Sequence, residues 1–262
     1  MIDLVQAKEV FSKYVNEFDV KDPKIDLKIR HTFHVQNLSE YLAENIGLND
    51  EDFRLASLIG LLHDIGRFEQ LKENDSYFDF TGWDHADYGI KLLFDDGMIR
   101  EFVKEDIYDE IIRKAIYHHN KITLVEDGLT EREILFAKII RDADKLDNYR
   151  VKVNDTFEAI IGATEEEVEN STYTEKIFED FKKEQLIVSK ECKTIIDFWL
   201  SFLAFTFDLN FKESYIYLKE NDYINREIDR INYKDEKTKE MMEEARVILH
   251  KYIDRKLNEE GK

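Results

Sequence analysis

The chain has 262 residues, 43% of them hydrophobic and 37% charged, which is enough for one large folded domain or two small ones. Its net charge of −20 repels nucleic acid duplexes and anionic membranes, so neither is an expected partner. A single cysteine, Cys192, excludes an intrachain disulfide and a Cys-rich zinc site, and it fits a reducing, cytoplasmic location.

The chain contains few residues that interrupt helices. One proline and nine glycines occur in the whole sequence, and this composition predicts an all-α protein. The N-terminus has neither the cationic start nor the apolar segment of a secretory signal. The most apolar stretch, residues 195–207, is interrupted by Asp197 and falls short of the ~20 residues that a membrane span needs. It is predicted to be a core helix or the interface of a homodimer.

In the first part of the chain, apolar residues recur at three- and four-residue steps. Residues 3–19 predict an amphipathic helix that ends before Pro23. The next helix places His31 on its apolar face, with His34 beside it, and Gly47 is expected to end it. Two histidines therefore lie on or beside a surface that faces the core.

An almost wholly apolar helix follows. Residues 55–62 are apolar apart from one serine, and they lead into His63 and Asp64, with Gly66 as the expected helix stop. An imidazole and a carboxylate at the end of a buried helix need polar partners, and a metal ion suits both. On its own, such a dipeptide is more often a hydrogen-bonded core histidine beside a turn than a pair of ligands.

Residues 66–84 have no helical period and predict a long loop, with Thr81-Gly82 as a turn. A loop of this length inside a compact domain is often functional. Asp84 is a good N-cap for a helix that begins at His85.

Two further helices carry the remaining polar side chains of interest. Residues 106–119 predict a helix with His119 on its apolar face and His118 at the edge of that face. The next helix begins with a capping box of Thr130 and Glu133. It contains the string Arg141-Asp-Ala-Asp-Lys-Leu-Asp147, in which charged and apolar residues alternate.

From about residue 155 the pattern stays helical, up to a terminal helix over residues 236–258, and carries no comparable cluster. No linker marks a domain boundary.

Six of the seven histidines fall between residues 31 and 119, at ends or buried faces of predicted helices. With Asp64 and Asp144 they predict a metal centre that a folded helical bundle assembles. Imidazoles and carboxylates without thiolates suit divalent Fe, Mn, Mg, Co, Ni or Zn, and the sequence does not decide among these ions. The ligands are too many for one ion, whereas Asp64 can bridge two ions held roughly 3.5–4 Å apart.

In this order the motifs resemble the HD superfamily of metal-dependent phosphohydrolases, whose pattern is His…His-Asp…His…His…Asp. Two specific strings carry the resemblance, Leu61-Leu-His-Asp-Ile-Gly66 and Asp142-Ala-Asp-Lys-Leu-Asp147. It implies a multi-helix HD-domain bundle with a C-terminal helical extension. The expected organisation is a single all-α unit, 1–262, made of an N-terminal helix (1–24), the HD core (25–150) and the extension (151–262).

The resemblance also implies the ligands of two ions. The first ion is assigned four ligands: His31, His63, Asp64 and Asp144. The second ion is assigned His85 and either His118 or His119, and the following Asn120 favours His119. The resemblance gives His34 no role, and it leaves Asp142 and Asp147 to positions behind the ligands or at the surface.

The activity that the resemblance implies is hydrolysis of a small, nucleotide-like phosphorylated substrate, a nucleotide or another small phosphoester, by metal-activated water. Asp64, or another carboxylate near the water, is the candidate general base. Arg67 and Lys145 are candidate phosphate contacts, and a surface ion pair fits Lys145 equally well.

Two other functions are compatible with the same residues. The six-ligand set is also similar to that of the mixed-valent di-iron oxygenases of the HD superfamily, which cleave C–C or C–P bonds. A non-catalytic module that senses a nucleotide is the third interpretation, and the complete ligand set argues against it. No Gly-Tyr-Pro follows His119, which disfavours a cyclic-dinucleotide phosphodiesterase of the HD-GYP type.

Overall fold

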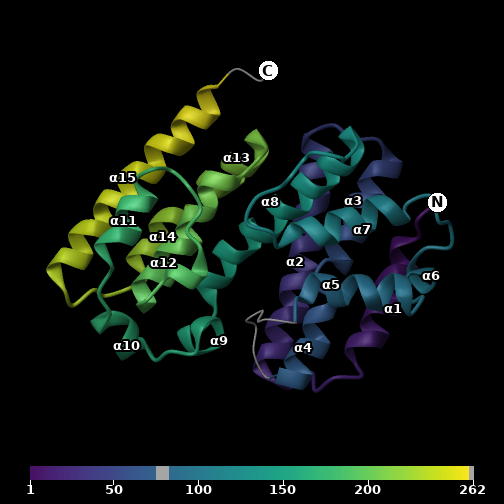
Figure 1. The fold of residues 1–262 in the computed structure, drawn as a ribbon, viewed down its shortest axis with the longest axis horizontal. Helices are drawn as coiled ribbons and strands as arrows, with labels where there is room; N and C mark the ends of the chain where they lie inside the picture. Colours follow the sequence, from purple (N-terminus) through teal and green to yellow (C-terminus); the bar gives the residue numbers. More distant parts are fainter. Residues whose placement is uncertain (75–82, 260–262) are drawn as a thin grey trace. The chain divides into compact units, whose positions relative to one another are not determined.

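The computed structural model describes residues 1–74 and 83–259, and within these ranges it contains helices and no strand (Figure 1). The prediction of an all-α protein is therefore confirmed. The chain divides into two compact units, residues 1–147 and 148–262, and the division falls inside one long helix. No helix in the described ranges is both long and apolar enough to cross a membrane.

The first unit carries, on its helices, the motifs singled out in the sequence. Its elements are α1 (Leu4–Val15), α2 (Pro23–Asn45), α3 (Asp50–Leu62), α4 (Gly66–Asn74), α5 (His85–Ile90), the π-helical turn η1 (Lys91–Asp95), α6 (Ile99–Phe102), α7 (Asp109–His119) and the first part of α8 (Glu131–Asn154).

The second unit takes up the end of α8 and continues with mostly short helices. Its further elements are α9 (Phe157–Ile161), α10 (Glu165–Asn170), α11 (Glu175–Phe181), the 3₁₀ turn η2 (Ser189–Glu191), α12 (Ile195–Leu203), the 3₁₀ turn η3 (Ala204–Asp208), α13 (Lys212–Glu220), α14 (Tyr223–Asp229) and α15 (Glu236–Asn258).

The helices α2 and α3 pack closely against each other. A Cβ on Gly60 of α3 would lie 2.7 Å from Oγ of Ser39 and 2.9 Å from Cα of Gln36, so the absence of a side chain permits this approach. After α2 the backbone turns at Gly47, whose φ of +78° explains the glycine and confirms the predicted helix end. The close packing of α2 and α3 places the imidazoles of two different helices in one core.

The predictions for Gly66 and for residues 66–84 were wrong in part. α3 ends at Leu62, residues 63–65 form a turn, and Gly66 begins α4 instead of stopping a helix. The physical reason for this glycine is a backbone contact, because a Cβ there would lie 2.7 Å from the main-chain nitrogen of Gly89 in α5 and closer still to the carbonyl of His85. The predicted Thr81-Gly82 turn lies outside the described residues.

Two predicted helix starts are confirmed at the level of hydrogen bonds. The carboxylate of Asp84 accepts from the main-chain nitrogen of Ala86 at 2.8 Å and so caps α5. Ahead of α8, the main-chain nitrogen of Thr130 donates to Oε2 of Glu133 at 2.7 Å, and the nitrogen of Glu133 donates to Oγ1 of Thr130 at 3.3 Å. These caps fix where the helices that carry His85 and Asp144 begin.

In the second unit, the apolar stretch 195–207 forms α12 and η3. Trp199, Leu200 and Leu203 are fully buried in this unit's core, whereas Phe198 is partly exposed. The predicted terminal helix is present as α15, with an apolar stripe that includes Met242 and Leu249 buried.

Candidate metal centre

His31 projects from α2 into the core of the first unit and is 2% exposed. Its Nδ1 lies 2.7 Å from Oδ2 of Asp147, and its Nε2 lies 3.1 Å from Oδ1 of Asp144, both on α8. Burial and the nearby Lys28 act to lower the pKa of His31, but the contacts with Asp144 and Asp147 outweigh them and raise the pKa above its ordinary value. Asp147 thus orients the ring so that Nε2 faces the other ligands.

His63 follows the last residue of α3 and is completely buried. Its Nδ1 donates to the main-chain oxygen of Gly60 at 2.8 Å, as a carbonyl can only accept. Burial lowers the pKa of His63 to about 3, so the ring is neutral at neutral pH and its Nε2 carries a lone pair. Within the described part of the chain this buried Nε2 has no hydrogen-bond partner, which is the arrangement expected of a metal ligand.

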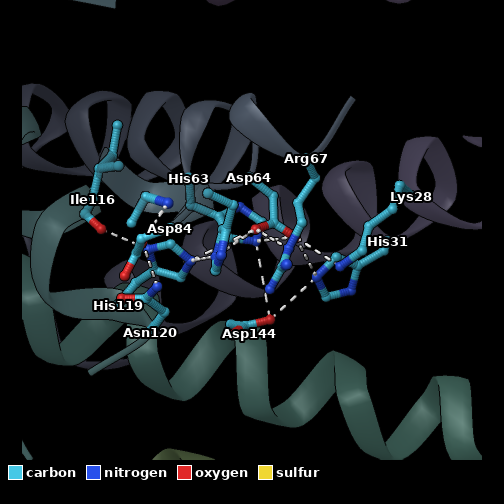
Figure 2. Close-up of polar contacts among 12 residues, drawn as sticks. Lys28, His31, His63, Asp64, Arg67, Asp84, Ile116, His119, Asn120 and Asp144 are labelled. Carbon is cyan, nitrogen blue, oxygen red and sulfur yellow. Dashed lines mark hydrogen bonds and ion pairs between the residues drawn. The ribbon is translucent and has the colours of Figure 1, made fainter. Parts of the chain in front are cut away.

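Asp64 lies at the middle of the centre, with a different set of neighbours at each carboxylate oxygen (Figure 2). Oδ2 is 3.7 Å from Nε2 of both His31 and His63. Oδ1 is 3.2 Å from Nε2 of His85 and 3.6 Å from Nε2 of His119. A single carboxylate therefore connects two pairs of imidazoles.

The second pair of imidazoles comes from α5 and α7. Nε2 of His85 lies 3.0 Å from Nε2 of His119, although 34 residues separate them. Nδ1 of His119 donates to the main-chain oxygen of Ile116 at 2.6 Å, which leaves its Nε2 with a lone pair directed at the centre. The buried Arg141 donates to the carbonyl of His118 at 2.8 Å and to that of Ile122 at 3.2 Å, and so holds the chain on both sides of His119.

These side chains fall into two groups that could each hold a metal ion: His31, His63 and Asp64, and Asp64, His85 and His119. Within each group the ligand atoms all lie within 4.8 Å of one another. Nitrogen and oxygen atoms bound about 2.1 Å from one ion lie roughly 3 to 3.5 Å apart, so small side-chain adjustments would complete either group.

The charges of the centre also suit cations. Burial acts to raise the pKa of Asp64, but Lys28 and His63 hold it well below its usual range. Burial likewise opposes ionisation of Asp144, and contact with His31 outweighs it and keeps that pKa low. Both carboxylates are therefore ionised at neutral pH, as metal ligands must be.

The structure separates the two candidates at the end of α7. His119 is buried and belongs to the second group, whereas His118 is half-buried, lies in a T-shaped ring contact with Tyr117 and is outside both groups. His34 is exposed on α2.

The two predicted phosphate contacts, Arg67 and Lys145, have different neighbours. Nε of Arg67 is 3.6 Å from Oδ1 of Asp64, and its Nη1 donates to Gln70 at 2.6 Å (Figure 2). Lys145 is buried on α8, and its Nζ lies 3.5 Å from the main-chain oxygen of Arg141.

One residue of the centre was missed by reasoning from the sequence. Nζ of Lys28 lies 2.7 Å from Oδ2 of Asp64, in the first group. The signal was its spacing, because a residue three positions before His31 lies on the same helix face. For Asp84 the sequence predicted the capping role but not the further hydrogen bonds that its carboxylate accepts from Asn120 and Lys121.

The fold and centre define an all-α protein with a buried His/Asp site able to hold divalent metal ions. Residues 29–149 match the family model of the HD domain, so the chain carries an HD domain over this stretch. Searches of curated proteins and of solved structures gave no match. The family match and the two ligand groups together support a metal-dependent hydrolase in general terms.

Proposed function

We propose that the protein is a phosphohydrolase that acts on a small, nucleotide-like phosphoester at a dinuclear metal centre. One observation carries the proposal, namely that the two oxygens of Asp64 face different pairs of histidines. Two divalent ions bound there would lower the pKa of a bound water and neutralise phosphate oxygens. His31, His63 and Asp144 would hold the first ion, His85 and His119 the second, and Asp64 both.

Cationic side chains beside Asp64 support an anionic substrate. Lys28 approaches Oδ2 and Arg67 approaches Oδ1, and the side chains of both are only 14% exposed. In a chain of net charge −20, such local cations offset the field that would otherwise repel a phosphate. An ammonium and a guanidinium can each donate charge-assisted hydrogen bonds to phosphate oxygens.

Solvent reaches the centre beside α8. The side chain of Asp144 is 23% exposed, against 4% for Asp64. We therefore expect substrate and water to approach from the side of Asp144. The more deeply buried Asp64 lies between the two pairs of histidines.

The experiment is a panel of nucleotides and simple phosphoesters, assayed with Mn, Mg, Co and Ni, with metal content measured on the same protein. We expect phosphate release that a chelator abolishes and that falls about 100- to 1,000-fold in Asp64→Asn. His63→Ala should lose activity similarly. The control is His250→Ala, which changes a histidine of the second unit that is hydrogen-bonded to Asn225, and this variant should retain full activity.

Two results would contradict the proposal. Iron with a mixed-valent signal, and no hydrolysis on the panel, would indicate an oxygenase instead. Nucleotide binding without turnover in a fully metallated protein would indicate a sensing module.

A further inference from the structure

Asp84 joins the two elements that carry the histidines of the second group. Its Oδ1 accepts from the main-chain nitrogens of Ala86 and Asp87 at 2.8 and 3.3 Å, which caps α5. The same Oδ1 accepts from Nδ2 of Asn120 at 2.9 Å, and Oδ2 accepts from Nζ of Lys121 at 2.7 Å. One carboxylate thus ties the start of α5 to the end of α7 (Figure 2).

Both ends of this connection lie next to a ligand. His85 directly follows Asp84, and His119 directly precedes Asn120. The connection therefore acts where it can set the separation of Nε2 of His85 from Nε2 of His119, which is 3.0 Å.

Capping alone does not require this arrangement. Asp3 caps α1 through the nitrogens of Val5 and Gln6, 3.0 and 3.1 Å away, and a cap needs no more than such bonds. The Asn120 amide, by contrast, turns its Nδ2 to Asp84, and its Oδ1 is left buried without a hydrogen-bond partner in the described residues. A buried oxygen without a partner costs stability, which argues that Asn120 serves the geometry of α5 and α7.

We propose that Asp84, with Asn120 and Lys121, is a positioning device for the second metal ion, and this inference rests on the proposed dinuclear centre. It holds His85 and His119 close enough to share one ion with Asp64. The first group has no part in the connection, so its ion should not depend on Asp84.

The test separates positioning from capping by leaving Asp84 in place. The variant Asn120→Ala/Lys121→Met removes the two donors that directly follow α7 and keeps the cap of α5. Its matched control is Asn221→Ala/Lys219→Met in the second unit, where Asn221 caps the end of α13 and Lys219 pairs with Asp254 at 2.8 Å. Each protein is titrated with Mn or Co after metal removal, and bound metal is counted per chain, with melting measured in the metal-free and loaded states.

We expect the wild type and the control to bind two ions, and the test variant to bind the first ion normally. Its dissociation constant for the second ion should rise about 10- to 100-fold, the usual effect of removing a residue that orients a ligand. Melting of the metal-free test variant should match that of the control, because the defect lies in ligand placement. Asn120→Ala alone should give an intermediate loss.

Three results overturn the inference, and they can be distinguished from one another. If the wild type binds two ions and the test variant binds both with unchanged affinity, Asp84 has no positioning role and the dinuclear centre stands. If the wild type itself never binds a second ion, the dinuclear function fails and the role of Asp84 fails with it. Equal loss of both ions in the test variant would indicate general disruption and would also contradict selective positioning.

Discussion

Oδ2 of Asp147 lies 2.7 Å from Nδ1 of His31, whereas Nδ1 of His119 donates to the main-chain oxygen of Ile116. A carboxylate behind a histidine raises its basicity as a ligand more than a carbonyl does. The two ligand groups are therefore unequal, and the group that contains His31 should bind its ion more tightly.

The variant Asp147→Asn tests this inequality. An amide can still hold the imidazole but carries no charge, so the affinity for the tighter ion should fall about 10- to 100-fold. Chelator competition followed by metal counting measures the change. Loss of the weaker ion, with the tighter one unaffected, would contradict the assignment of Asp147 to His31.

The contact between α4 and α5 predicts a graded effect of two glycine substitutions. A Cβ at Gly66 would meet the backbone of α5, whereas one at Gly89 would lie 3.3 Å from the Cγ2 of Ile65, a side-chain atom that can move. Gly66→Ala should therefore move His85 away from Asp64, lose the second ion and destabilise the protein by about 1–3 kcal/mol. Gly89→Ala should have a much smaller effect on metal content and urea unfolding. Equal behaviour of the two variants would show that the backbone contact does not set the position of His85.

Lys28 should have opposite effects on metal binding and on catalysis. Its ammonium lies 2.7 Å from Oδ2 of Asp64, where its charge repels a cation and attracts an anionic substrate. Lys28→Met should tighten metal binding and lower kcat/KM for a phosphoester about 10- to 100-fold, the effect of one lost charge-assisted hydrogen bond. Lys28→Arg should restore both values toward the wild type. A fall in metal affinity in Lys28→Met would contradict this role.

Buried Glu227 predicts that the stability of the second unit depends on pH. The residue is 0% exposed, and burial raises its pKa to about 8, against the opposing effects of Lys152 and Arg230. Between pH 4.5 and 8 the folded chain holds a proton that the unfolded chain has released, so stability falls as pH rises, by up to about 1.4 kcal/mol per pH unit. The loss is complete above pH 8.

Urea unfolding at pH 5 and pH 8 measures this dependence. Glu227→Gln cannot ionise, so its stability should change much less between the two pH values than that of the wild type. An equally steep dependence in the variant would assign the effect to other groups.

The sequence predicted most of the candidate centre because its ligands lie in short strings with local meaning. His63 and Asp64 are adjacent, and Asp144 and Asp147 lie one turn apart on a helix whose start is marked by a capping box. The all-α class followed from composition, since very few residues in the chain oppose a helix.

Other features could not be predicted because they depend on contacts between distant segments. The start of α4 at Gly66 reflects its contact with α5, and a glycine in that position resembles a helix stop when read locally. The separate environments of His118 and His119 arise because α7 turns one ring toward Asp64 and leaves the other at its edge.

By itself, then, the sequence determined the helical class and the order of the ligands, since helix periodicity, caps and motif strings are properties of neighbouring residues. Only the tertiary structure decided that Asp64 stands between two pairs of histidines, that Lys28 reaches it, and that Asp84 joins α5 to α7. Several of these relations join residues that lie 34 to 37 positions apart in the sequence. Side chains so far apart meet only when burial of the apolar faces packs their helices together.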